Sequence, residues 1–402
     1  MTAQTNQRSP VSTSGYRGWI VGSIASTTGD AAFNVALSWA ATSMGATAAS
    51  WILATPGIVS VVCLIFAGFA TDHYSAKRVL TWASGFFALG GAAITLVSFF
   101  GHLSYLWLLG FAVVIGLRAA IYSPASVTLT RQLVAPERFG NALSLRQVIT
   151  QLASVLGRPL GGALVALGGL GAAAVFLMST YVISFGSVVR TKTGDQSHPD
   201  TTPDNSPGKL FGGIAYVSQS KLMSQLVIVT GLAAGLILPI PTLLVPVWAR
   251  QNSLGVSAVG WMAAVMAASA IGVALVVSNR GPRRRLGLTA TIGIFIAGAG
   301  ALAFATSSFG VVLAACAVVG VGQGLFMTHA APLVKAVPAG QMGKVQAIIT
   351  MAQTLAISAG TLALGGLASL IKTQAAVYWG LGIVVVAVVA IVLTTFRRST
   401  AN

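Results

Sequence analysis

Charged residues are scarce in this sequence, and acidic residues are the scarcest of them. Charged side chains make up 7% of the 402 residues, and only six residues are Asp or Glu. A soluble globular domain carries about a quarter charged residues. Because 55% of the chain is hydrophobic, the composition excludes an ordinary soluble domain and indicates an integral membrane protein.

Cysteine is also rare. Cys63 and Cys316 both lie inside apolar runs, which excludes a disulfide framework and a cysteine metal site. We find no nucleophile with a matching base, no metal-ligand cluster and no nucleotide-binding loop, so neither an enzyme nor an ATP-driven pump is expected. We therefore predict no metal and no cofactor, with a proton gradient as the energy source.

Long apolar runs dominate the chain. Each has roughly 20 residues, the length that crosses a hydrocarbon core about 30 Å thick. They lie at 18-40, 49-71, 79-100, 104-129, 141-168, 171-189, 222-248, 257-278, 286-305, 310-334, 345-370 and 374-396. The sequence therefore predicts an all-α integral membrane protein with twelve transmembrane helices.

The basic residues between these runs fall almost entirely on one side. With twelve crossings, only Arg250 and Lys372 lie on the side opposite the termini. Basic loops resist translocation, so both termini are predicted to be cytoplasmic, in the cytoplasmic (inner) membrane. This placement explains the net charge of +17 without a nucleic-acid partner, and we expect a monomer in the lipid bilayer.

A polar segment divides the chain into two halves with similar sequence patterns. The stretch "RTKTGDQSHPDTTPDNSPGKL" separates six runs from six, and Gly140 and Gly343, like Gly157 and Gly360, lie 203 residues apart. This is typical of transporters built from repeats. We predict a cytoplasmic tail (1-17), an N-terminal six-helix bundle (18-189), a cytoplasmic loop (190-221), a C-terminal six-helix bundle (222-396) and a short cytoplasmic tail (397-402).

One motif after the second run resembles a known family. "GFATDHYSAKRVL" carries Gly68, Asp72 and Lys77 at the spacing of the cytoplasmic signature of the major facilitator superfamily, although His73 and Ala76 replace two usual bases. The resemblance implies the major facilitator fold, in which two pseudo-symmetric six-helix bundles rock around a central site. It also implies a cytoplasmic gate, for which the candidates are Gly68, Asp72, Lys77 and Arg78.

Further segments resemble one branch of that superfamily. "GDAAFNVALSWA", "YSPASVTLTRQLVAPERFGNALSLRQ" and "LFGGIAYVSQSKLM" are similar to the macrolide-efflux and enterobactin-exporter group, which implies efflux of drugs or siderophores by an antiporter. "GRPLGG" is similar to the antiporter motif of the fifth span. It contains Gly157, Arg158, Pro159, Gly161 and Gly162, with Arg158 at the proline position.

Few charged residues lie inside the predicted spans, and each is a candidate for function. Asp30 is the only carboxylate among them; it follows Arg17 by thirteen residues, as Arg118 precedes Arg131 by thirteen. At 1.5 Å per residue both lie about 20 Å from the cytoplasmic end, so they can pair. The resemblance implies that Arg118 couples proton and substrate movement, whereas a purely structural ion pair is the alternative.

His329 is a third proton-coupling candidate because histidine titrates near neutral pH; packing or gating is its alternative role. Arg146 is either a ligand contact or a gate residue, and Arg158 is expected to gate or to contact headgroups. The predicted substrate contacts are polar, charged or aromatic side chains within the spans: Asn34, Arg118, Tyr122, Arg146, Gln151, Trp261, Gln323, Phe326 and Gln353.

We expect a central cavity with charged side chains on one wall and apolar surface on the other. Such a cavity suits a small amphiphilic substrate. The leading hypothesis is a proton-coupled secondary exporter of drugs or siderophore-like molecules by alternating access. Two alternatives are a proton-linked importer of organic anions and a membrane sensor that does not transport.

Overall fold

A computed structural model describes residues 14–73, 75–100, 104–135, 139–191, 221–280, 286–330, 342–371 and 374–399. Within these ranges the chain forms helices and no strands. Helix is the expected form for apolar runs in lipid, because a helix satisfies its backbone hydrogen bonds internally. The fold is all-α, as the composition predicts.

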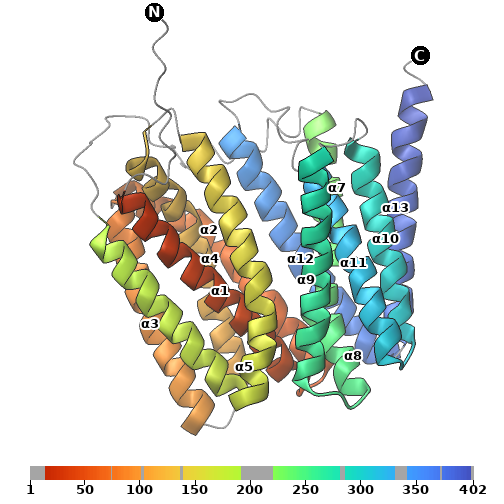
Figure 1. Cartoon of the computed structure of the whole chain (residues 1–402), viewed down its shortest axis with the longest axis horizontal. Coiled ribbons are helices and arrows are strands. Elements are labelled where there is room, and N and C mark those ends of the chain that lie inside the picture. The colour runs from red at the N-terminus through yellow and green to blue at the C-terminus, as the bar shows by residue number, and fades with distance from the viewer. Residues whose placement is uncertain are drawn as a thin grey trace, which may run out of the picture.

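The first half of the chain lies on one side of the molecule (Figure 1). Its helices are α1 (Ser14–Thr42), α2 (Ala46–His73), α3 (Ala76–Phe100), α4 (Tyr105–Leu133) and α5 (Phe139–Arg190). Helix α5 packs on both α1 and α3, and α2 packs on α4. Helix α4 also contacts both α1 and α5, so these three helices surround a shared interior.

The second half lies beside it. Its helices are α7 (Lys221–Ile237), a π-helical turn η3 (Ile240–Leu244), α8 (Val245–Gln251), α9 (Val256–Arg280), α10 (Leu286–Leu302), a 3₁₀ turn η4 (Ala303–Ala305), α11 (Phe309–Ala330), α12 (Met342–Ile371) and α13 (Ala375–Ser399). Residues 192–220, which contain most of the predicted inter-bundle loop, lie outside the described ranges.

The helices account for the twelve predicted passes. Nine stretches of the described chain are long and apolar enough to cross a membrane, and one of them, Val148–Arg190, contains two passes. Helices α1 and α13 supply the remaining two. The two passes of α5 are divided at Gly168 and Gly169, where Gly169 has φ 64° and ψ −158°. Only glycine adopts that conformation readily, so the chain reverses there.

The seventh span changes helix type along its length. Prolines at 239, 241 and 246 remove backbone donors, and the helix passes through the π-helical turn between α7 and α8. The described pass therefore changes from α-helix to π-helix and back, with a turn at Leu238.

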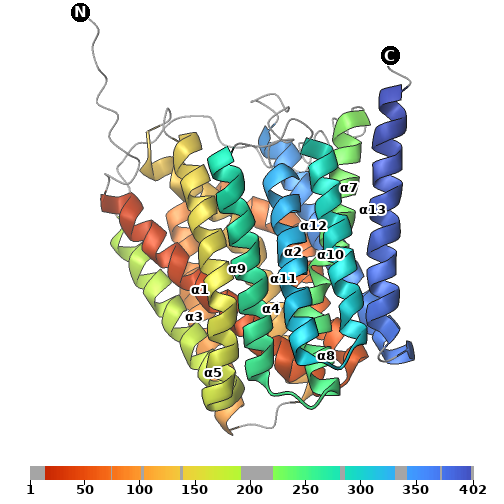
Figure 2. The same ribbon diagram turned by 45° about the vertical axis from the view of Figure 1, so that its right-hand side comes forward.

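The passes run between two opposite faces of the molecule. The tail face is where α1 begins at Ser14 and α13 ends at Ser399, and the closed face is the opposite one, where α8 ends at Gln251 and α9 begins at Val256 (Figures 1 and 2). Each pass runs between these faces, so a residue's place along its helix gives its depth.

The two halves are joined toward the closed face. Arg250 of α8 donates to the Thr42 hydroxyl (2.9 Å) and to the Trp39 carbonyl (2.6 Å), and its guanidinium lies 4.0 Å from the Trp39 ring centroid. Ser38 donates to the Thr242 carbonyl. These bonds hold the end of α1 against η3 and α8.

Deeper contacts extend this junction toward the middle of the molecule. Ser358 of α12 donates to the Ala54 carbonyl of α2 at 3.0 Å. Gly162 of α5 meets Gly260 of α9 so closely that a Cβ on Gly162 would lie 2.6 Å from the Gly260 Cα. Glycine is therefore required for this approach of the two helices.

The predicted gate motif lies between α2 and α3 at the tail face. Gly68 and Asp72 belong to α2, but their side chains lie outside the described set. Lys77 is half-buried and Arg78 is exposed, and the Arg78 amide donates to the Ser75 hydroxyl at 3.4 Å. The gating role of these residues stays a prediction.

Candidate functional site

An ion pair forms the centre of the site. Arg118 of α4 donates from Nη1 to Oδ2 of Asp30 on α1, so the two residues predicted from depth to pair are in contact. Their side chains are 11% and 20% exposed respectively. Because water is largely excluded, each charge depends on the other for its stabilisation.

Two tyrosines complete the surroundings of this pair. Tyr181, in the second pass of α5, donates to the other carboxylate oxygen, Oδ1 of Asp30, at 2.6 Å. The Arg118 guanidinium lies 4.8 Å from the Tyr181 ring centroid and 4.7 Å from that of Tyr122. Arg118 and Tyr122 share one face of α4, as their spacing predicts. The rings add cation–π attraction to the ion pair.

A second arginine, Arg146, lies close by, and no carboxylate among the described residues pairs with it. Arg146 of α5 donates from Nη2 to the Ser126 hydroxyl at 2.7 Å, and its guanidinium lies 5.7 Å from the Trp19 ring centroid. Trp19 in turn packs on Tyr122, with ring centroids 5.8 Å apart, and donates to Thr130. Arg146 thus differs from Arg118, which pairs with Asp30.

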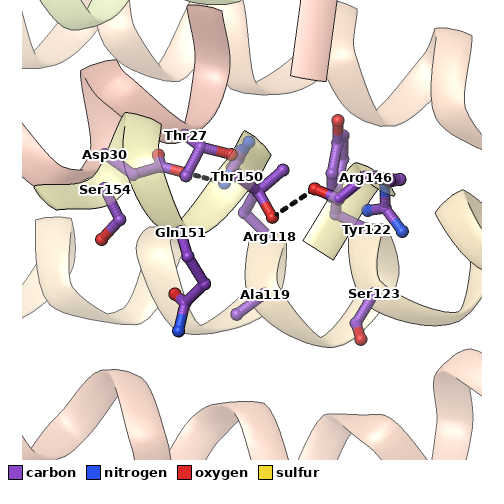
Figure 3. Close-up of a pocket in the computed structure, with 10 residues that line it drawn as sticks. All are labelled: Thr27, Asp30, Arg118, Ala119, Tyr122, Ser123, Arg146, Thr150, Gln151 and Ser154. Carbon is purple, nitrogen blue, oxygen red and sulfur yellow. Dashed lines mark hydrogen bonds and ion pairs between the residues drawn. The ribbon is translucent and has the colours of Figure 1, made fainter. Parts of the chain in front are cut away.

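Asp30, Arg118, Tyr122 and Arg146 line one cavity of about 320 Å³, near the lower end of the range for ligand sites. Its walls come from α1, α4 and the first pass of α5 (Figure 3). The lining residues are Thr27, Asp30, Arg118, Ala119, Tyr122, Ser123, Arg146, Thr150, Gln151 and Ser154. The cavity is thus lined by one ion pair, an additional cation and several hydroxyls. Its apolar surface comes from Ala119 and the ring of Tyr122.

Four buried polar atoms of the described residues have no hydrogen-bond partner, and two of them, on Tyr122 and Arg146, belong to residues that line the cavity. The Tyr122 hydroxyl, Arg146 Nε and the hydroxyls of Ser23 and Ser184 are buried and unsatisfied within the described structure. Leaving such a group unpaired costs about 1–3 kcal/mol. Buried polar groups in native proteins are normally satisfied by protein, water or ligand, so the site has unused capacity for hydrogen bonds.

The glycines of the predicted span-5 motif are packing residues here. A Cβ on Gly157 would lie 2.6 Å from the Thr28 carbonyl oxygen of α1, and one on Gly161 would overlap the backbone at Ala32. This close approach holds the first pass of α5 against α1 and so positions the cavity wall. Arg158 is half-buried and Pro159 lies within α5; neither lines the cavity.

Several predicted substrate contacts lie away from the cavity. Asn34 is exposed, Trp261 on α9 is 66% exposed, and Phe326 on α11 is buried in the core of the second half. Gln323 and Gln353 are half-buried outside the cavity lining. Their roles remain predictions, as does that of His329, whose side chain is outside the described set.

The structure also adds residues that sequence reasoning missed. Tyr181 bonds Asp30, Trp19 supports Tyr122 and Arg146, and Ser126 accepts from Arg146. Thr150 and Ser154 line the cavity, and they follow Arg146 at helical spacings of four and eight residues. That spacing is a signal in the sequence that could have found them.

Solved structures with the same architecture are numerous. The chain resembles a POT family transporter in complex with a thioalcohol conjugated peptide (TM-score 0.73, 11% identity, covering 95% of this chain and 96% of that one). It also resembles a mutant of the nucleoside transporter NupG (0.72, 12%, covering 94% and 99%). A third is a bacterial homologue of the iron transporter ferroportin in an inward-facing state (0.67, 19%, covering 94% and 98%). At these identities the likeness shows the fold.

No curated protein matches the chain. A family model described as the Major Facilitator Superfamily matches residues 19–361, which include every cavity-lining residue and the helices that pack around them. The chain therefore belongs to the Major Facilitator Superfamily and is a multi-pass membrane transporter of that type.

Proposed function

We propose that this protein is a proton-coupled secondary active exporter of small amphiphilic molecules, working by alternating access. The observation that carries the proposal is the Asp30–Arg118 ion pair in the wall of the cavity. A carboxylate inside a membrane protein is stabilised by a cation or neutralised by a proton. Asp30 alternates between these two partners, and the exchange links proton movement to the occupancy of the cavity.

The distribution of contacts between the halves supports alternating access. The bonds of Arg250, Ser38 and Ser358 join the halves from the closed face inward. If both termini are cytoplasmic, as the basic residues predict, the closed face is the outer one and the structure is an inward-facing state. The substrate then reaches the cavity from the cytoplasm, the side from which an exporter loads.

The direction of transport rests on the resemblance to the macrolide-efflux and enterobactin-exporter branch. One observation favours a second candidate function, proton-linked uptake of organic anions: the cavity contains two guanidinium groups, Arg118 and Arg146, and one carboxylate, Asp30. In either direction we propose that a monomer in the cytoplasmic membrane acts with the proton gradient and without a cofactor.

Reconstituted liposomes test the proposal. A pH gradient is imposed, and the movement of fluorescent anionic, neutral and cationic amphiphiles is followed for the parent protein and for Asp30→Asn. The parent protein is expected to drive at least one probe uphill, whereas Asp30→Asn exchanges that probe across the membrane but does not concentrate it. Equal uphill transport by both proteins would overturn the coupling role of Asp30. Probe binding without movement would identify a sensor.

A further inference from the structure

Within the proposed transport function, we infer that Arg146 is an anion-binding residue and that the substrate is an organic anion whose acidic group lies between Arg146 and Arg118. The positive charges in the cavity outnumber the negative ones. Asp30 neutralises Arg118, whereas Arg146 faces a hydroxyl and an aromatic ring. Among the described residues no carboxylate neutralises Arg146, so the cavity has a net positive charge.

The unsatisfied atoms indicate the same ligand chemistry. Arginine Nε is only a donor, and the Tyr122 hydroxyl can donate. Arg146 and Tyr122 both line the cavity, and neither of these buried atoms has a hydrogen-bond partner among the described residues. What is missing is an acceptor. A carboxylate or a phosphate supplies several acceptor positions and fits the planar guanidinium in a bidentate manner.

A cation would be less well accommodated. It would have to displace Arg118 from Asp30, and it would then lie in a cavity that holds two guanidinium groups and one carboxylate. A neutral ligand would leave Arg146 without a counter-charge in surroundings where charge is costly. The body of the anion has apolar surface available at Ala119 and the Tyr122 ring, which suits an aromatic or otherwise apolar acid.

An anion at this position also acts on the proton site. It attracts Arg118 and weakens the interaction of this guanidinium with Asp30, so the carboxyl group of Asp30 is protonated more readily. Binding linkage is reciprocal, and protonation of Asp30 therefore strengthens anion binding. Two ligands that favour each other's binding are carried in the same direction, so confirmation of the anion site would replace export with the second candidate, proton-linked uptake, as the direction of transport.

Three probes with one ring system separate the possible charges: naphthoate, naphthamide and naphthylmethylammonium. Their affinities are measured by ligand-induced thermal stabilisation of the purified full-length chain, because a ligand that binds the folded state raises its apparent stability. Naphthoate alone is expected to stabilise the parent protein. Arg146→Gln should lose at least about tenfold in naphthoate affinity, and Arg146→Lys should lose less.

Arg190→Gln is the charge-matched control, because Arg190 is exposed at the end of α5 and lies outside the cavity; it should bind naphthoate as the parent does. Each variant must melt cooperatively without a probe. Equal naphthoate binding by Arg146→Gln and the parent, or equal binding of naphthamide and naphthoate by the parent, would overturn the anion site.

The two proposals fail in different assays. If Arg146→Gln binds naphthoate normally but Asp30 is required for uphill flux, the substrate class is wrong and proton-coupled transport stands. If naphthoate binding depends on Arg146 but no probe moves in an Asp30-dependent manner, the anion site stands and the transport proposal is wrong.

Discussion

Tyr181 donates a 2.6 Å hydrogen bond to Asp30, on the carboxylate oxygen that Arg118 does not use. The bond joins the second pass of α5 to α1, so both oxygens of Asp30, the only carboxylate among the described residues that line the cavity, are engaged by donors. Each donor stabilises the ionised carboxylate relative to the same carboxylate without that donor. Tyr181 therefore helps to set how readily Asp30 takes up a proton.

Tyr181→Phe should shift the midpoint of the pH profile of proton-driven flux to higher pH. The variant removes one donor that stabilises the ionised carboxylate, so protonation of Asp30 needs less acid, while the ring beside Arg118 is kept. The measurement is initial flux against pH in reconstituted liposomes. Ser179→Ala is a control that removes an exposed hydroxyl two residues away; an identical profile for Tyr181→Phe and the parent would contradict this role.

Arg118→Gln should destabilise the protein because it leaves the Asp30 carboxylate without its cation. Removing one partner of a buried pair costs roughly 3–5 kcal/mol, whereas replacing both costs much less. The double variant Asp30→Asn with Arg118→Gln is therefore expected to be more stable than Arg118→Gln alone. Thermal unfolding of the four proteins in this cycle measures the coupling. Additive effects of the two substitutions would show that the residues do not stabilise each other.

Arg250→Gln should loosen the closed face. It removes two charged hydrogen bonds and a cation–π contact that hold α8 against the end of α1, and so favours states in which the halves separate there. A cysteine at position 50 reports this opening, because Ser50 is buried at 1% exposure against Gly365 of α12. Cys63 and Cys316 are replaced beforehand.

In that background, Arg250→Gln should raise the labelling rate of Ser50→Cys by an impermeant thiol reagent several-fold. Arg190→Gln, which removes an exposed arginine at the tail face, should leave the rate unchanged. Equal labelling rates in all three proteins would mean that Arg250 does not stabilise the closed face.

Much of the fold and the centre of the site could be predicted because they follow from length and depth. Apolar runs of about 20 residues predict the passes, and equal distances from Arg17 and Arg131 placed Asp30 and Arg118 at one level. A spacing of four residues placed Tyr122 beside Arg118. These inferences need only the rise and the period of a helix.

The missed contacts depend on how helices rotate against one another. The reversal at Gly168 and Gly169 determines which face of the second pass of α5 packs against α1. Tyr181 lies in an apolar run, so the sequence around it did not indicate that it contacts Asp30. Helix α9 is apolar around most of its circumference, and nothing in its sequence showed whether Trp261 pointed toward the cavity or, as found, lay exposed outside its lining. Period alone cannot choose a face when every face is apolar.

The measurement that tests the central claim most directly is infrared difference spectroscopy of the purified protein between mildly alkaline and mildly acidic pH. If Asp30 exchanges Arg118 for a proton, acidification produces the carbonyl band of a protonated carboxyl group in the parent protein, and this band is reduced by one group in Asp30→Asn. Arg118→Gln should show the same band appearing at higher pH, because the stabilising cation is absent. Identical difference spectra for the parent and Asp30→Asn would contradict the claim that Asp30 carries the proton.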